Sequence, residues 1–384
     1  MAINRGFQAR RVHIAGSISP RTLNDLADYA HVMVKIVVQE ILEAGGGIVV
    51  GAGKEPLLDH GLPVLFDWTV LEAVDQCIQA GACFNHLGGS CPIIVVLSEK
   101  GEKEIPDHRK TLWHRLVQSG KVDVISIRPG VRSASMIRDK QVSYGDILLI
   151  LGGGSGVEHL AENYQKTGKP VIPLDLPLGA SREDGTGGSV RLNREARAEP
   201  LKFIKLQKHR AGCEGALLTA ISTENGSIEV SNVARGITEI IFNLALPTVF
   251  YVRLLNFQHE AHSRVERFFR NVVDPLIEEL GMTRIDLGID RLESGFINLE
   301  IFQRLSLARV AVVDITGERP NCFIELGYAL GKGIQVICTA EEGTRLPFDQ
   351  QAIPCFFWND KDDDIKRKQD LFKFWEQYIG RGFI

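Results

Sequence analysis

The acidic residue Glu325 lies in a pattern that could place it in a reactive site. An apolar run ends in Asp314, and Gly317 and Pro320 then favour a turn followed by a helix start. This order predicts a strand that ends at the carboxyl edge of a parallel sheet, and a helix that carries Glu325 one turn from its start. Ligands of α/β folds bind at this edge. A carboxylate on an otherwise apolar helix is costly unless something uses it, so Glu325 is a catalytic candidate; local capping or pairing is the alternative.

The same segment resembles the signature of TIR-like and nucleoside deoxyribosyltransferase-like domains. The matching residues are Asp314-Ile315-Thr316-Gly317, Pro320-Asn321 and Glu325-Leu326-Gly327-Tyr328-Ala329. The resemblance covers residues 248–338 and implies that Glu325 helps to break an N-glycosidic bond of NAD or of a nucleoside. These families contain both enzymes and non-catalytic relatives.

Four further residues are predicted to bind the substrate beside Glu325. The resemblance implies that Asp314 and Tyr328 belong to this group. Arg253 could hold a phosphate by a bidentate contact, or form an ordinary salt bridge to Asp290 or Asp314. Asn321 could orient a ribose hydroxyl, although a helix cap is favoured for an asparagine beside a proline.

A glycine-rich segment in the first half of the chain forms a second candidate site. Gly152-Gly153-Gly154-Ser155-Gly156 follows the apolar strand 147–151 and precedes the helical pattern 157–161. Glycines let backbone amides approach an anion, and the helix start adds its dipole, so the segment predicts a phosphate cradle. A tight turn without a ligand is the alternative.

Residues 135–140 precede the strand at a spacing that could place Arg138 at the edge of the sheet. Together, Arg138 and the glycine-rich turn resemble the lysine-decarboxylase-like phosphoribohydrolase (LOG) family and its SLOG sensor relatives. The resemblance spans residues 11–174 and includes Gly16-Ser17 after the first strand and Gly51-Ala52-Gly53 after the second.

The chain departs from the LOG hydrolases, which carry Pro-Gly-Gly-x-Gly-Thr-x-x-Glu. Here Gly152, Val157 and Leu160 replace the proline, the threonine and the catalytic glutamate. Glu158 lies about 200° around the helix from Leu160 and cannot substitute for that glutamate. The resemblance therefore implies a sensor that binds a nucleotide signal and has lost hydrolysis. Its implied contacts are Gly16, Ser17, Arg138, Gly153, Gly154, Ser155, Gly156 and Glu158.

Strands alternating with helices predict an α/β fold with two Rossmann-like or flavodoxin-like domains and mainly parallel sheets. Residues 8–246 form the expected SLOG-like domain, with a flexible loop at 178–200 and linking helices at 203–246. Residues 247–384 form the expected TIR-like effector domain. The expected strands are 12–15, 48–50, 93–97, 122–127, 147–151 and 171–174, then 249–254, 284–289, 309–314 and 334–339.

Composition indicates a cytoplasmic protein that binds neither nucleic acid nor membrane. The 384 residues are 44% hydrophobic with a net charge of −4, and their basic residues are dispersed. Apolar runs have strand length, and the polar N-terminal segment does not resemble a signal peptide. The seven cysteines are scattered and read as reduced. His259 and His262 lack an evident third ligand, so no metal site is expected.

The combined pattern predicts a nucleotide-activated N-glycosidase, most simply an NAD hydrolase of bacterial antiviral defence. NAD would be the substrate and no cofactor is expected, while the resemblance to TIR-like domains implies a homo-oligomer. Two alternatives remain open at this point. The second domain could act on nucleosides or nucleotides, or neither domain could be catalytic and the chain could be a nucleotide-responsive assembly module.

Overall fold

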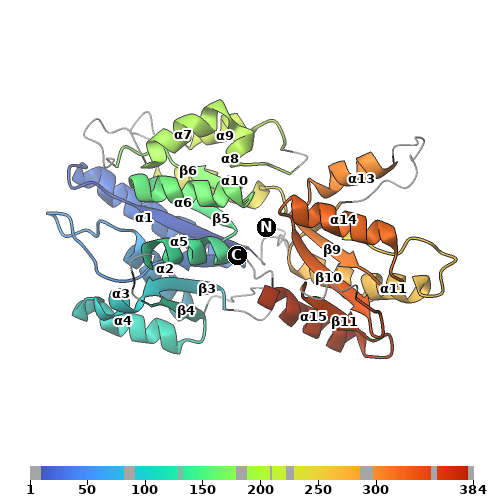
Figure 1. The fold of residues 1–384 in the computed structure, drawn as a ribbon. Helices are drawn as coiled ribbons and strands as arrows, with labels where there is room; N and C mark the ends of the chain where they lie inside the picture. The colour runs from blue at the N-terminus through green and yellow to red at the C-terminus, as the bar shows by residue number, and fades with distance from the viewer. Residues whose placement is uncertain are drawn as a thin grey trace. The chain divides into compact units, whose positions relative to one another are not determined.

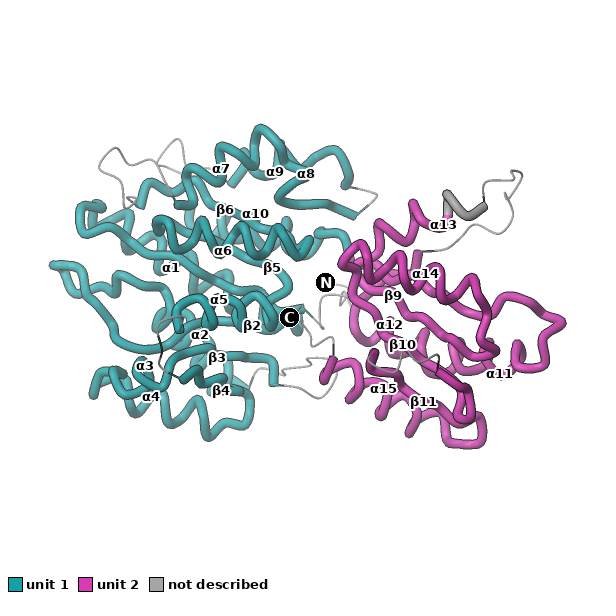
Figure 2. The backbone as a smooth tube through the Cα atoms, in the orientation of Figure 1, with its two compact units in different colours: residues 1–245, 381–384 teal, residues 246–380 magenta. Residues whose placement is uncertain are grey.

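In the computed structural model the chain divides into two compact units (Figure 2). Unit 1 comprises residues 1–245 and 381–384, and unit 2 comprises residues 246–380. The structure describes residues 10–81, 91–128, 130, 133–178, 188–207, 210–221, 229–285, 297–346 and 353–378.

Unit 1 is built on a six-stranded parallel sheet of order β4-β3-β2-β1-β5-β6 (Figure 1). The order reverses between β1 and β5, where Ser17 pairs with Gly152. This is the position at which open α/β sheets bind ligands. The six predicted strands are confirmed: β1 Arg11–Ser17, β2 Gly47–Val50, β3 Ile93–Ser98, β4 Val122–Ile127, β5 Ile147–Gly152 and β6 Val171–Pro173.

Helices cover both faces of this sheet, because successive residues of its strands face opposite sides. Ile48, Val50 and Val95 join the main core, while Val49 and Ile94 pack with residues of α5 in a smaller cluster on the other face. The helices are α1 Asn24–Glu43, α2 Asp67–Gln79, α3 Glu99–Lys103, α4 Asp107–Gln118, α5 Ser133–Tyr144, α6 Ser155–Lys166, α7 Gly188–Ala198, α8 Pro200–Phe203, α9 Glu214–Ala220 and α10 Val230–Asn243.

The predicted loop 178–200 is wrong over residues 188–198, which form α7. Its charged composition conceals a buried face with Leu192 and Ala196. Asn193 donates a hydrogen bond to the Pro173 carbonyl at 2.8 Å, which ties the helix to the end of β6. Tertiary contacts of this kind stabilise a helix whose local pattern is weak.

Unit 2 has a five-stranded parallel sheet of order β11-β10-β9-β7-β8, which is the flavodoxin-like order. Its switch point lies between β7 and β9. The fifth strand, β11, was not predicted. The strands are β7 Thr248–Val252, β8 Thr283–Arg284, β9 Val310–Asp314, β10 Gln335–Glu341 and β11 Cys355–Trp358. The predicted remainder of β8 lies outside the described residues after Ile285.

The helices of unit 2 follow the predicted order, with one change of type. The helical segment from His262 to Glu279 contains a π-helical turn at Phe269–Val273, just before Pro275, whose missing N–H interrupts the regular hydrogen bonding. The helices are α11 His262–Phe268, α12 Asp274–Glu279, α13 Ile297–Leu305, α14 Pro320–Gly331 and α15 Asp364–Tyr378.

Of the helices that the structure describes, none has the length and apolar character needed to cross a membrane.

Candidate functional site

The helix α14 places Glu325 in its second turn, as the sequence predicts, because Pro320 occupies the first helical position. The Glu325 carboxylate is half-buried and has no hydrogen bond or ion pair with the residues that the structure describes. Loss of solvation raises its pKa to about 7. A perturbed acid of this kind at the edge of a sheet is typical of functional sites.

The surroundings of Glu325 differ from the predicted apolar face. Leu326 and Ala329 are buried, but Ile324 and Leu330 are exposed. Glu325 therefore lies at the border of the buried face rather than within it. This border position explains why the carboxylate loses part of its solvation and is not enclosed.

Cys322, one helical turn before Glu325, links the two acids that the sequence singled out. The thiol is buried, and its pKa is raised to about 12 by loss of solvation and then by the charges of Glu325 and Asp314. Both carboxylates therefore act on one thiol. The sequence does not single out Cys322, because the environment of its thiol is set by residues that the fold brings near it.

Asp314 is fully buried, and its carboxylate accepts three hydrogen bonds. The donors are the Thr316 amide at 3.1 Å, the Thr339 hydroxyl at 2.8 Å and the Trp358 indole at 3.0 Å. Burial raises the pKa of Asp314, and these hydrogen bonds oppose the rise. Asp314 thus connects β9 with β10 and β11, and its contact with a ribose stays a prediction.

Replacing Asp314 with alanine should lower the free energy of unfolding of unit 2 by about 3 kcal/mol, because three buried donors lose their acceptor. Urea unfolding followed by tryptophan fluorescence measures this change. Thr339→Val removes one of the three bonds and should cost less. Normal stability of Asp314→Ala with lost substrate binding would restore the role in binding.

Two of the other three residues predicted beside Glu325, Arg253 and Tyr328, make structural contacts. Arg253 pairs with Glu266 at 2.6 Å, not with Asp314, and its guanidinium lies 5.0 Å from the Phe269 ring centroid. The alternative partner, Asp290, lies outside the described residues.

The sequence favoured Asn321 as the cap of α14, and this prediction is wrong. Arg319 is the residue before the first helical position, and Asn321 is exposed in the first turn. The Tyr328 ring stacks on Phe302 of α13 with centroids 4.6 Å apart, so it contributes to helix packing. Asn321 and Tyr328 lie four residues before and three residues after Glu325 on α14, so the three residues share one side of the helix.

His259 lies at the switch point of unit 2. A β-carbon on Gly317 would be 2.9 Å from the His259 ring, so the turn after β9 packs against the loop after β7. His259 Nδ1 accepts a hydrogen bond from the Ala261 amide at 3.2 Å. A neutral ring with this contact carries its proton on Nε2. In the described part of the chain, no three metal-ligating side chains lie together.

In unit 1 the glycine-rich turn packs closely against its neighbours. The Gly153 amide donates to the Ser17 carbonyl at 2.9 Å, and the Gly152 amide donates to the Ser189 hydroxyl at 2.7 Å. A β-carbon on Gly188 would lie 2.1 Å from the Gly153 carbonyl oxygen. Gly16 is likewise required by packing, since its β-carbon would lie 1.8 Å from the Leu151 oxygen. These glycines allow the close packing of the turn. The Gly153 amide donates to Ser17 and is therefore not free to bind a phosphate.

The next three amides, of Gly154, Ser155 and Gly156, form the start of α6. None of them donates a hydrogen bond to a described residue. Backbone N–H groups at a helix start, combined with the helix dipole, bind anions. This part of the turn has the geometry of the predicted phosphate cradle.

Glu158 contacts the start of α7. Its carboxylate accepts a hydrogen bond from the Gly188 amide at 2.8 Å and pairs with Arg191 at 3.2 Å. These contacts fix the start of α7 beside the glycine-rich turn, and the contact of Glu158 with a nucleotide stays a prediction. Leu160, at the position of the LOG glutamate, is buried.

Arg138 lies on α5, half-buried, and its Nε is enclosed without a hydrogen-bond acceptor among the described residues. A buried guanidinium nitrogen without an acceptor is costly. An anionic ligand would supply that acceptor, and the role of Arg138 in binding one stays a prediction.

Comparisons with known proteins identify the region that contains this turn. The family described as "ATP nucleosidase Cap17-like, N-terminal" matches residues 7–239. Two curated relatives, both "ATP nucleosidase Cap17", come from Escherichia coli strain KTE188 and from Escherichia coli. Each is 32% identical over 195 residues, which is 50% of this chain and 37% of the relative. The match thus covers little more than a third of each relative's length, and the family match ends before unit 2.

Proposed function

Because this chain belongs to the family of Cap17-like ATP nucleosidase N-terminal regions, we propose that it is a nucleotide-responsive N-glycosidase of bacterial antiviral defence. Unit 1, a SLOG-like sensor, binds a nucleotide signal. Unit 2, a TIR-like effector, then breaks the bond between a base and ribose, with NAD as the preferred substrate. The relatives' name supports nucleotide glycosidase chemistry in this group of proteins.

The half-buried carboxylate of Glu325 is the observation that carries this proposal. With a pKa of about 7, part of the population is ionised at neutral pH. The ionised form stabilises an oxocarbenium-like transition state, or attacks the anomeric carbon. The nicotinamide ring of NAD is cationic and leaves as a neutral base. Its departure needs no proton, which suits a site with a single acid.

ATP is the second candidate substrate, and the relatives' printed name favours it. Adenine leaves more readily when it is protonated, so this reaction requires an acid as well as a carboxylate. His259, at the switch point of unit 2, is the residue that we assign to this role in that case; it acts as the imidazolium, in which Nδ1 carries a proton and no longer accepts the Ala261 amide.

Product analysis separates these reactions. The full chain is incubated with NAD, ATP or deoxynucleosides across a panel of nucleotide signals, and released bases are measured by chromatography. We expect nicotinamide and ADP-ribose from NAD. Adenine and ribose triphosphate from ATP would transfer the assignment to ATP, and base exchange between deoxynucleosides would indicate a transferase. No turnover with any signal would support the non-catalytic assembly module.

The sensor role of unit 1 rests on the amides at the start of α6 and on Arg138, whose Nε is buried without an acceptor among the described residues. We also propose that ligand binding drives self-association. Light scattering with and without the activating nucleotide tests this, and a chain that becomes active as a monomer would contradict it.

A further inference from the structure

The carboxylate of Asp67 is a polar group of unit 1 that is not part of the proposed phosphate cradle. Asp67 is the first residue of α2 and lies against the end of β2. A β-carbon on Gly51 would be 2.9 Å from one carboxylate oxygen and 3.5 Å from the other. Within the described ranges Asp67 has no hydrogen-bond or ion-pair partner, and burial raises its pKa to about 6.

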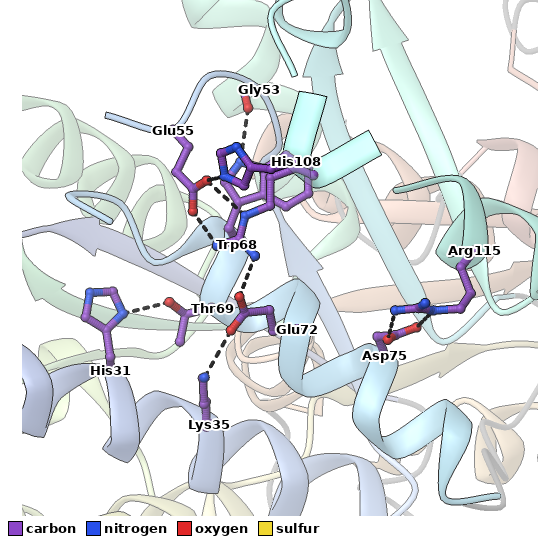
Figure 3. A network of polar contacts seen from close by, with 11 residues as sticks. His31, Lys35, Gly53, Glu55, Trp68, Thr69, Glu72, Asp75, His108 and Arg115 are labelled. Carbon is purple, nitrogen blue, oxygen red and sulfur yellow. Dashed lines mark hydrogen bonds and ion pairs between the residues drawn. The ribbon is translucent and has the colours of Figure 1, made fainter. Parts of the chain in front are cut away.

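The absence of a described partner for Asp67 contrasts with three other polar side chains of α2, Thr69, Glu72 and Asp75, which all have partners (Figure 3). Thr69 bonds to His31, and Glu72 pairs with Lys35 and Arg109. Asp75 pairs with Arg115. These contacts reach α1 and α4, so α2 is fixed from two sides.

The start of α2 is fixed as well. The Trp68 indole donates to the Gly53 carbonyl at 3.0 Å, and Arg109, which pairs with Glu55, lies 5.5 Å from the Trp68 ring centroid. Asp67 is thus held in place by its neighbours, while its own carboxylate stays available.

A chain of contacts connects Asp67 with the phosphate cradle. Leu65, two residues before Asp67, forms a bridge with Ser17 at the end of β1. The Ser17 carbonyl in turn accepts the Gly153 amide. Asp67 therefore lies at the carboxyl edge of β2, next to the switch point between β1 and β5.

We propose that Asp67 accepts hydrogen bonds from the ribose hydroxyls of a ribonucleotide whose phosphate occupies the start of α6. In dinucleotide-binding folds an acid at the end of the second strand contacts the ribose, and Asp67 occupies the corresponding place from the start of α2. A carboxylate accepts hydroxyl donors and repels phosphate, so the two parts of the site bind different parts of one ligand. This inference rests on the nucleotide binding that we propose for unit 1.

Calorimetry with ADP, 2′-deoxy-ADP and 3′-deoxy-ADP tests the assignment. The full chain carries Glu325→Gln, so that the probe is not consumed. Asp67→Asn removes the charge and keeps the shape. Gly51→Ala keeps the charge but displaces the carboxylate. Asp107→Asn is the matched control, since Asp107 also begins a helix and its side chain is 94% exposed.

We expect loss of a ribose hydroxyl to weaken binding about tenfold to a hundredfold, the usual range for a hydrogen bond to a charged group. Asp67→Asn should weaken ADP binding to a similar extent, and the deoxy analogues should then lose little more. Gly51→Ala should act in the same direction and Asp107→Asn should change nothing.

If both site variants bind ADP and its deoxy analogues as the parent does, the role of Asp67 is wrong and the cradle stands. The parent could instead bind ADP and both deoxy analogues with equal affinity, while Asp67→Asn weakens the binding of all three. Asp67 would then contact another donor, and the ribose assignment would be wrong. If the parent binds no ADP, the cradle itself is overturned, and the inference with it.

Discussion

Replacing Glu325 with glutamine should reduce base release by the activated protein about a thousandfold or more, because glutamine keeps the shape of the side chain and removes its charge. The neutral amide neither stabilises a developing oxocarbenium ion nor attacks the anomeric carbon. Initial rates with NAD and with ATP, measured at saturating signal, test this expectation.

Glu278→Gln is the matched control, since Glu278 is an exposed helical glutamate of the same unit with no role in the proposed site. It should leave the rate unchanged. A Glu325→Gln variant with normal turnover would remove Glu325 as the catalyst.

The pH dependence follows from the raised pKa of Glu325. The ionised form is the reactive one, so the rate should rise with pH between about 6 and 8 and level off above that range, as expected for a pKa of about 7. A rate that instead falls across this interval would indicate that Glu325 acts as an acid.

Glu325→Gln should lower the activity but raise the stability of the folded protein. A carboxylic acid with a pKa raised by folding favours the folded state most below its unfolded pKa, and this contribution is lost as the pH rises through about 7. Glu325→Gln should therefore stabilise the protein by about 1–2 kcal/mol at pH 8, after allowance for partial solvent access, and by little near pH 4.5. Denaturant unfolding at both pH values measures the difference.

Replacing Gly16 with alanine should destabilise unit 1 by about 3 kcal/mol or more. The new β-carbon would lie 1.8 Å from the Leu151 carbonyl oxygen, which is backbone and cannot move aside without separating β1 from β5. Hydrogen exchange of peptides from these two strands, together with denaturant unfolding, should report the loss.

Gly156→Ala supplies the contrast, because apart from its chain neighbours and its own helix backbone no atom of a described residue lies within 4 Å of the added β-carbon. This variant should keep the stability of unit 1. If Gly16→Ala unfolds like the parent, the strands must accommodate a β-carbon there, and the close packing of β1 on β5 would be wrong.

The sequence by itself determined the two parallel sheets, most of their strands and the helical position of Glu325. These properties depend on local patterns: apolar strands of fixed length, glycine and proline at turns, and the alternation of strands with helices. Where the local pattern was weak, as in the charged helix α7 and the short strand β11, sequence reasoning failed.

Only the tertiary structure decided which polar groups are satisfied and which remain available. Asp314 and Trp358 are 44 positions apart in the chain, and Glu158 and Gly188 are 30 apart. No local pattern reveals such partners. The same fold leaves the carboxylates of Glu325 and Asp67 without partners among the described residues, because availability for a ligand depends on what long-range packing places beside each charge.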